Sequence, residues 1–414
     1  MSGLAVDADR LLGRLKALGE VGRDKDGRLV RLAATDADRA GRDRLAGWLA
    51  EAGLEVVVDR IGNLFGLWRP EACADRAPLM LGSHIDTVRD GGIYDGAYGV
   101  IAGLEVIQSL MATGFAPARP ILLAAFTNEE GARYAPDMMG SLVYAGGLSL
   151  DEALATCGED GSVLGEELAR IGYAGTVEPG FLRPHAYVEL HIEQGPVLER
   201  EGLRIGVVES LQGISWRRVS FEGRANHAGT TPMAMRRDAG HAAAVAIAHL
   251  RELAQASGPA TVATAGTLRL EPNVINVVPR RAVFSVDLRD PDEARLQAAE
   301  GALERFLAEL AEREGLTLNI ESLARFEPVI FDEAICRRIE RAAGARGLSW
   351  RRMASGAGHD AQMIARICPA AMIFVPSQGG ISHNPREHTE PEDLVAGANV
   401  FLDVVAGLAG EEGE

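Results

Sequence analysis

Cysteine is scarce in this chain, and positive charge is outnumbered. The four cysteines lie far apart in 414 residues and form no Cys-x-x-Cys pair: Cys73, Cys157, Cys336 and Cys368. This spacing suggests neither a disulfide framework nor a zinc ribbon, and it predicts reduced thiols that are mostly buried. Lys and Arg number 42 against 59 Asp and Glu, which gives a formal charge of -17, and no basic cluster is present. Binding to nucleic acid is therefore disfavoured.

The chain also lacks the marks of export and of membrane insertion. Its first ten residues contain Asp7 and Asp9 where a secretory signal has bases, and no apolar run approaches the ~18 residues of a membrane span. We therefore expect a cytoplasmic protein that contacts no membrane. Hydrophobic residues make up 47% and charged residues 24%, the balance of a globular protein. Because 414 residues are many for one core, we expect two domains.

Several catalytic motifs are missing as well. The chain has no His-Glu-x-x-His helix, no Gly-x-Ser-x-Gly elbow, no Gly-x-x-x-x-Gly-Lys phosphate loop and no dinucleotide fingerprint. Serine catalysis and nucleotide chemistry thus lack their main parts.

Short β-rich runs alternate with helical periods between about residues 41 and 212. Strands are expected at 55–58, 79–82, 121–126 and 186–190, with an amphipathic crossover helix at 100–110. This alternation predicts an α/β domain with a mixed, largely parallel sheet. Polar residues fall at or just past the carboxyl ends of these strands, where open α/β sheets bind ligands: His84, Glu129, Glu130 and His191.

Residues 213–327 show a different pattern of expected strands and helices. Strands at 215–223, about 261–270, 281–289 and 316–320 and helices at about 238–255 and 291–313 follow one another in a β-α-β-β-α-β order. That order is typical of an α+β ferredoxin-like sandwich. The α/β pattern resumes at about 328, with a helix at 333–345 and an apolar strand at 371–375. We expect residues 213–327 to be inserted into a catalytic domain made of 1–212 and 328–414.

The polar segments carry metal-binding chemistry. His84 and Asp86 are two positions apart, so on an extended chain Asp86 can accept the second ring N–H of His84 and fix its tautomer. Asp95 stands in a glycine-rich stretch and could bridge two metal ions. The adjacent Glu129 and Glu130 point apart, which suggests one metal ligand and one general base. Imidazoles and carboxylates without a thiolate suit Zn²⁺, Mn²⁺ or Co²⁺.

Each segment also has an ordinary structural interpretation. A single histidine is usually structural or exposed, a Glu-Glu pair is commonly a solvated helix face, and Asp-Gly is more often a turn than a ligand. The combination at successive strand ends, in an acidic chain, favours a metallohydrolase.

These segments resemble those of the N-carbamoyl-L-amino acid amidohydrolases and allantoate amidohydrolases, a branch of the aminoacylase-like dinuclear metallopeptidases. The resemblance covers nearly the whole chain and is carried by Gly82–Val88, Phe126–Arg133, Leu190–Pro196 and His227–Met233. It implies two divalent ions, Zn²⁺ first, with Mn²⁺, Co²⁺ or Ni²⁺ as alternatives. One ion would be bound by His84, Asp95 and His191, and the other by Asp95, Glu130 and His383. Glu129 would be the general base.

The resemblance also implies a substrate site and a homodimer formed by the inserted domain. Arg289 and Asn276 would bind a substrate carboxylate, with Gln194 as a further polar contact and Gly358 where the main chain approaches the substrate. His227 would steady the carbonyl oxygen in the transition state, and the resemblance allows it to do so across the dimer interface. From alternation alone, Ser285, Asp287 and Arg289 share one face of a strand, which without the resemblance is more simply a solvated face.

The activity that this predicts is hydrolysis of N-carbamoyl-L-amino acids to the L-amino acid, ammonia and CO₂. Allantoate or ureidoglycolate amidohydrolase stays open, because those substrates also combine a ureido group with a carboxylate. An aminoacylase or peptidase would need a pocket for an acyl group. A catalytically silent binding protein of the same fold would be expected to lack a ligand.

Overall fold

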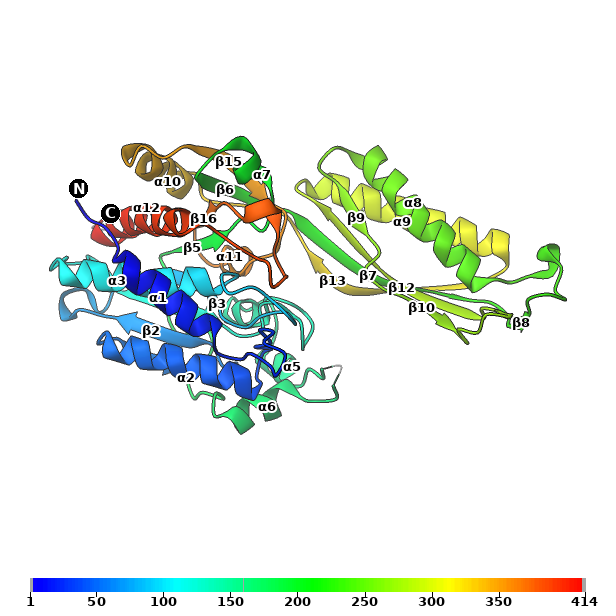
Figure 1. Ribbon diagram of the computed structural model, residues 1–414, viewed down its shortest axis with the longest axis horizontal. Helices are drawn as coiled ribbons and strands as arrows, with labels where there is room; N and C mark the ends of the chain where they lie inside the picture. The colour runs from blue at the N-terminus through cyan, green and yellow to red at the C-terminus, as the bar shows by residue number, and fades with distance from the viewer. Residues whose placement is uncertain (1–2, 159, 412–414) are drawn as a thin grey trace. The chain divides into compact units, whose positions relative to one another are not determined.

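A computed structural model describes residues 3–158 and 160–411, so Met1 and Ser2 of the N-terminal segment considered above lie outside it. The chain forms two compact units (Figure 1). One runs up to Glu209 and resumes at Ile330, and the other is Ser210–Val329. The boundaries expected from the sequence were 212 and 328.

The larger unit is built on a mixed sheet. Within the described ranges it has nine strands in the order β1-β2-β4-β3-β5-β16-β6-β14, with β15 beside β6. The central strands β4, β3, β5 and β16 are parallel, whereas β1, β2 and β6 run antiparallel to their neighbours. The strands are β1 (Glu55–Val58), β2 (Leu64–Trp68), β3 (Leu79–His84), β4 (Ile121–Phe126), β5 (Ala186–Ile192), β6 (Ile205–Leu211), β14 (Val329–Ile330), β15 (Trp350–Ser355) and β16 (Ala370–Val375).

Helices cover both faces of this sheet. Every residue of β3, β4, β5 and β16 is buried. Leu190 of β5 packs on α12 near Gly397, while its neighbour Glu189, pointing to the opposite face, accepts the N–H of Ala361 in α11. The helices are α1 (Ala8–Gly19), α2 (Asp36–Glu51), α3 (Ala97–Ala112), α4 (Met139–Tyr144), α5 (Leu150–Leu154), α6 (Leu164–Ile171), α7 (Val197–Glu201), α10 (Glu333–Ala345), α11 (Asp360–Ile364) and α12 (Pro391–Gly410). Two buried faces explain why the central strands are apolar throughout.

Helix α12 is long and apolar enough to cross a membrane by composition, but 67% of its most apolar window is buried inside the unit. It packs on α3 and α10 and on β16, as a core helix does. The four cysteines are free; Cys73, Cys336 and Cys368 are buried and Cys157 is exposed.

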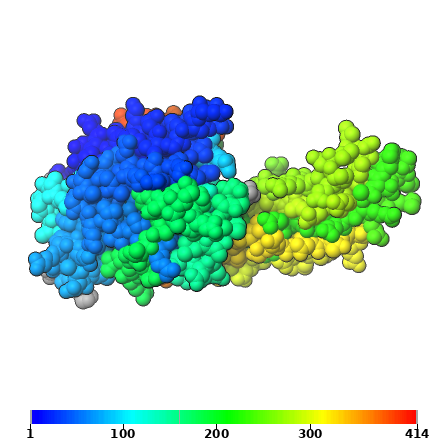
Figure 2. Space-filling view, turned by 90° about the horizontal axis from the view of Figure 1, so that it is seen from below, coloured from blue at the N-terminus to red at the C-terminus, as the bar shows by residue number. Residues whose placement is uncertain are grey.

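Figure 2 shows α2 and the segment around α6 side by side on one face of this unit. The Tyr173 hydroxyl donates to Asp43 at 2.8 Å, and Arg170 pairs with Asp36. These contacts tie the N-terminal segment to the chain that follows β4.

The smaller unit is an antiparallel sheet in the order β10-β12-β7-β13, with β9 beside β12, packed on two helices. Its elements are β7 (Gly213–Glu222), β8 (Asn226–His227), α8 (Ala239–Ser257), β9 (Val262–Thr264), β10 (Leu268–Glu271), β11 (Val277–Val278), β12 (Arg281–Asp290), α9 (Glu293–Glu314) and β13 (Thr317–Phe326). Along β12, Phe284, Val286 and Leu288 enter the core with α8 and α9, while the alternate residues are partly exposed. This is the β-α-β-β-α-β order of a ferredoxin-like sandwich.

Candidate metal centre

Two groups of possible ligands meet at Asp95 in the larger unit. Oδ1 of Asp95 lies 3.2 Å from Nε2 of His191 and 3.7 Å from Nε2 of His84. Oδ2 of Asp95 lies 3.2 Å from Nε2 of His383, which is 3.3 Å from Oε2 of Glu130. In each group the ligand atoms are all within 4.8 Å of one another. One carboxylate therefore faces a separate set of ligands with each of its oxygens.

Strand ends and one glycine position these groups. His84 ends β3, His191 lies in β5, and Glu129 and Glu130 follow β4. Asp95 stands just before α3, whose N-cap is Gly96 with φ 62°. A Cβ at Gly96 would lie 2.3 Å from Nε2 of His84, so only glycine leaves room for that imidazole.

The histidine tautomers follow from their contacts. Nδ1 of His191 lies 2.8 Å from the main-chain oxygen of Ile192, and Nδ1 of His84 lies 3.0 Å from that of Asp86. A carbonyl oxygen only accepts, so each Nδ1 carries the proton. In these neutral rings each Nε2 carries the lone pair that metal ligation requires, and that of His191 accepts the N–H of Gly96 at 3.1 Å.

The main-chain oxygen of Asp86 is the near partner of His84, while its carboxylate Oδ1 is 3.9 Å from the ring. The expectation that the carboxylate would orient His84 assumed an extended chain through residue 86, but β3 ends at His84. The Asp86 carboxylate instead accepts the N–H groups of Glu129 and Glu130, each at 3.3 Å. It holds the main chain of the two glutamates.

Glu129 and Glu130 point in different directions. Oε2 of Glu129 lies 3.3 Å from Nε2 of His84, whereas Glu130 accepts the N–H of Val88 and faces His383. Burial and the nearby carboxylates raise the pKa of both glutamates well above the usual value. Their surroundings thus disfavour negative charge unless a cation balances it.

The electrostatics of the cluster fit divalent cations. Burial alone would raise the pKa of Asp95, but hydrogen bonds from the protonated forms of His191 and His383, present when no cation is bound, bring it well below the usual range. Burial lowers the pKa of His84 to about 4, so that ring is neutral and can act as a ligand. Among the described residues, the ion pairs of Asp95, Glu129 and Glu130 are all with histidines. Several buried carboxylates with only imidazole partners form a suitable donor set for Zn²⁺ or Mn²⁺.

Gln194 lies among the ligands. Its Nε2 donates to Oδ2 of Asp95 at 2.9 Å, while its Oε1 is buried without a hydrogen-bond partner. A substrate N–H could satisfy that oxygen, so the expected substrate contact stays a prediction. Gly358 lies in the turn between β15 and α11, directly before His359, and its role also stays a prediction.

Glu189, His191 and His359 form a third group of possible ligands. The carboxylate of Glu189, however, is already engaged by Ser83 at 2.7 Å, by Tyr187 at 3.1 Å and by the N–H of Ala361 at 2.9 Å. The ring centroids of His359 and His191 lie 4.5 Å apart, with the ring planes tilted by 58°. We therefore interpret Glu189 and His359 as residues that pack around His191 and not as a third cation site.

Arg31 supports the loop after His84, and the sequence did not indicate this role. Arg31 is fully buried, and its guanidinium donates to the main-chain oxygens of Ile85, Leu18 and Val21. Burial lowers its pKa to about 10. It ties α1 to the loop that follows His84. Local sequence could not identify it, because its acceptors are main-chain atoms distant in the chain.

His227, Asn276 and Arg289 belong to the smaller unit. Val277 pairs with His227 between β11 and β8, so Asn276 and His227 are neighbours. Arg289 lies elsewhere: its Nε and Nη2 contact the Asp287 carboxylate at 2.9 to 3.2 Å.

His227 and Arg289 stand at opposite ends of the smaller unit: Arg289 lies in the five-stranded sheet, and His227 lies in the separate pair of β8 and β11. Arg281 pairs with Glu222 and Arg289 with Ile214, eight positions further along β12. At ~3.3 Å per residue this ladder spans about 26 Å, and β8, which follows β7 in the chain, lies beyond the Arg281 end of it (Figure 1). One small substrate cannot contact both residues of the same chain.

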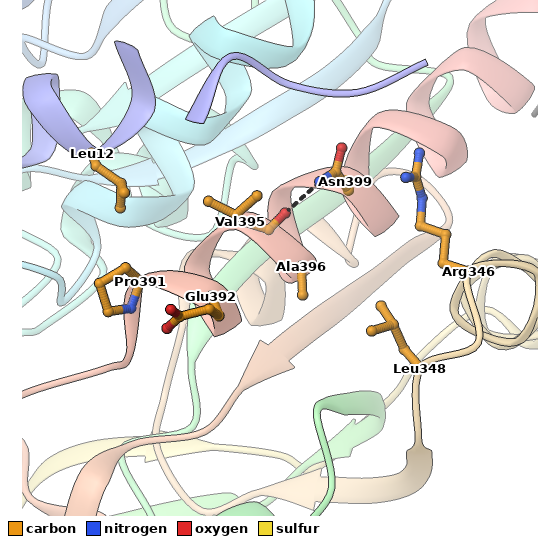
Figure 3. A pocket seen from close by; sticks show the side chains of 8 residues that line it. All are labelled: Leu12, Arg346, Leu348, Pro391, Glu392, Val395, Ala396 and Asn399. Atoms are coloured by element: carbon orange, nitrogen blue, oxygen red, sulfur yellow. Dashed lines mark hydrogen bonds between the residues drawn. The ribbon is translucent and has the colours of Figure 1, made fainter. Parts of the chain in front are cut away.

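A groove of about 500 Å³ elsewhere in the larger unit contains none of the candidate ligands (Figure 3). Two of its polar side chains are engaged: Arg346 pairs with Asp403, and Nδ2 of Asn399 donates to the main-chain oxygen of Val395 at 2.9 Å.

An α/β sheet with two acid and imidazole groups sharing a carboxylate at the carboxyl ends of its strands defines a hydrolase with a candidate two-cation centre. The model of Peptidase family M20/M25/M40 matches residues 80–407. The chain belongs to this family.

Individual relatives agree. An N-carbamoyl-L-amino-acid amidohydrolase of Rhizobium meliloti is 41% identical over 98% of this chain and 97% of its own length. An allantoate amidohydrolase of Bacillus subtilis is 37% identical over 95% of each chain. The crystal structure of an amidase of the hydantoinase/carbamoylase family from Burkholderia vietnamiensis has 42% identity and a TM-score of 0.93 over 99% of each chain.

Proposed function

We propose that this chain hydrolyses N-carbamoyl-L-amino acids. The observation that carries the proposal is the pair of ligand groups sharing Asp95, with Glu129 beside them. The name of the Rhizobium meliloti relative supports the substrate class. One water and one carbamoyl amino acid give the L-amino acid, ammonia and CO₂.

His84, Asp95 and His191 would hold one divalent ion, and Asp95, Glu130 and His383 the other. Bound there, the ions would supply charge that polarises a carbonyl and makes a nearby water more acidic. Zn²⁺ suits these ligands best, and Mn²⁺, Co²⁺ and Ni²⁺ suit them too.

Glu129 would take the proton of the attacking water. Its carboxylate is buried and faces the ligand groups without belonging to either. Once cations balance the charge, its pKa falls and the ionised form can act as a base. The same proton can then pass to the nitrogen that leaves as the amine of the product.

Arg289 and Asn276 would bind the substrate carboxylate, since a guanidinium fork matches a carboxylate in two hydrogen bonds. His227 would steady the carbonyl oxygen. Its Nδ1 accepts the N–H groups of Gly229 and Thr230 at 3.1 and 3.3 Å, so Nε2 carries the proton and is a donor.

We further propose a homodimer in which His227 serves the site of the partner subunit. The separation of His227 from Arg289 within the smaller unit supports this arrangement, because both are assigned to one small substrate. Large apolar side chains near His227 are exposed, with Met233 at 76%, Met235 at 74% and Ile275 at 103%. Such a patch fits a protein contact. We also propose a cytoplasmic location, which the four free and scattered cysteines support.

A second candidate is allantoate hydrolysis, favoured by the relative of that name in Bacillus subtilis. The same ligands, base and arginine would serve a substrate with ureido groups and a carboxylate.

Release of ammonia from the ureido compounds, and of the free amino acid from the acetyl compound, tests the proposal. The purified protein, supplied with Zn²⁺ or Mn²⁺, is given N-carbamoyl-L-amino acids, allantoate, ureidoglycolate and an N-acetyl amino acid. We expect turnover of the carbamoyl compounds. Turnover of allantoate or ureidoglycolate alone would move the activity to ureides, and turnover of the acetyl compound alone would make the protein an aminoacylase.

A further inference from the structure

One buried carboxylate beside the candidate centre belongs to neither ligand group. Glu387 is 6% exposed and lies four residues after His383. Its Oε1 accepts the N–H groups of Tyr94 and Asp95 at 3.1 and 3.2 Å. Its Oε2 accepts the hydroxyl of Ser382 at 2.7 Å. A single side chain thus joins the segment that carries Asp95 to the segment that carries His383.

The glycine-rich stretch before Asp95 is shaped around this carboxylate. A Cβ at Gly92 would lie 2.0 Å from Oε1 of Glu387 and 2.5 Å from its Cβ. Glu387 is itself fixed by a turn in which its N–H donates to the main-chain oxygen of Asn384 at 3.0 Å. The close approach explains a glycine at 92, where any other residue would push the loop away.

Ordering such a loop costs conformational entropy, because glycine has more freedom to lose than other residues. Two main-chain N–H groups held by one buried carboxylate oppose that cost. Both donors are buried or half-buried, so without Glu387 they would lose their partner where water has little access.

We propose that Glu387 is a positioning residue. It fixes the segment that carries Asp95 relative to the segment that carries His383, so that both groups of ligands can bind cations at the same time. Glu387 belongs to none of the groups of possible ligands. It acts through the loop of Asp95 and through Ser382, which precedes His383. This role depends on the two-cation centre of the proposed function, but not on which amide is hydrolysed.

The test compares Glu387→Ala with Glu387→Gln. Alanine removes all three contacts. Glutamine keeps the shape: its oxygen can accept from Tyr94 and Asp95, and its amide can donate to Ser382. The matched control is Glu105→Ala, since Glu105 is a buried glutamate of the same unit that accepts from Asp7, Arg10 and Ser109, away from the ligands.

The readouts are the number of Zn²⁺ ions per chain after dialysis, the Zn²⁺ affinity in competition with a chelator, and the thermal unfolding of the metal-free protein. We expect Glu387→Ala to lose one ion or to bind Zn²⁺ at least ~10-fold more weakly, and Glu387→Gln to recover most of the affinity. Glu105→Ala should lower the unfolding temperature and leave the affinity unchanged.

Wild-type stoichiometry and affinity in Glu387→Ala would overturn the proposal, and so would an equal loss of affinity in Glu105→Ala. Because cation binding is measured and not turnover, a failure to hydrolyse ureido compounds would overturn the proposed function and leave this result unaffected.

Discussion

Gly96 and His84 are packed so closely that a methyl group on Gly96 would lie 2.3 Å from the Nε2 atom of the imidazole. Gly96→Ala should therefore displace the His84 ring and weaken cation binding. We expect at least a ~10-fold loss of Zn²⁺ affinity, measured by competition with a chelator.

Gly114→Ala is the control for this variant. Gly114 also has a positive φ, 71°, but a Cβ there would meet no atom within 4 Å. It carries the same backbone penalty of ~1 kcal/mol without the clash. If both variants lose affinity equally, the contact with His84 is not the cause.

The same substitution should affect different properties at Glu129 and at Glu130: turnover at the first and cation binding at the second. Glu129→Gln is expected to keep two Zn²⁺ ions per chain and to lower kcat by about 100-fold or more, because an amide cannot accept the proton of water. Glu130→Gln is expected to weaken cation binding. Metal content and kcat of the two variants, measured together, check the assignment; full turnover by Glu129→Gln would place the base elsewhere.

Mixing two inactive variants should restore activity. If His227 and Arg289 of one site come from different chains, a dimer of one His227→Ala chain and one Arg289→Ala chain has one intact site and one doubly altered site. Random reassociation of equal amounts would then give about a quarter of wild-type activity.

The controls for this mixture are each variant reassociated alone, and an Arg281→Ala chain in place of Arg289→Ala. Arg281 lies on the same strand, paired with Glu271. If the mixture of His227→Ala and Arg289→Ala stays inactive although mixed dimers form, one chain supplies both residues.

Asp59 should make stability depend on pH. It is fully buried and accepts the main-chain N–H of Asn63 at 2.8 Å, yet burial raises its pKa to about 7. The folded protein then holds a proton that the unfolded chain, with a pKa of about 3.9, releases. This contribution to stability is complete below the unfolded pKa and is lost as the pH rises through 7.

Relative to Asp59→Asn, which cannot titrate, the wild type should lose roughly 2 to 3 kcal/mol of unfolding free energy between pH 5 and pH 8. Urea unfolding of both metal-free proteins measures the difference. Asp290 is the control, because hydrogen bonds from Thr261 and Arg295 outweigh burial and lower its pKa. The difference in unfolding free energy between the wild type and Asp290→Asn should therefore not change over this pH range. If the difference between the wild type and Asp59→Asn does not change either, Asp59 is ionised in the folded protein.

The alternation of strands and helices, and the positions where strands end, could be predicted because they depend on short stretches of sequence. The runs that ended near His84, Glu129 and His191 form β3, β4 and β5, and parallel strands bring their carboxyl ends to one edge. The expected helix at 333–345 is α10. Strand β2 and helices α1 and α2 had no expected counterpart, since their patterns are short or strongly charged.

The details of the centre depend on contacts between distant segments. Asp86 was expected to orient His84 through its carboxylate, but the chain leaves the strand after His84 and the carboxylate binds the main chain of Glu129 and Glu130. Glu387 was overlooked because an acid in an Asn-Pro-Arg-Glu turn has the pattern of an exposed loop. Its burial arises from the loop of Asp95, almost 300 positions earlier.

The ligand segments lie far apart along the chain, and this determines at which stage of synthesis the metal centre can form. His84 and His383 are separated by 299 positions of sequence, and the whole of the smaller unit is synthesised between them. As a chain emerges from the ribosome, its first sheet strands can pair long before the last histidine is made. The nascent protein would thus carry an acidic, incomplete half-centre until the final thirty or so residues appear, and cation capture would be one of the last events in its maturation.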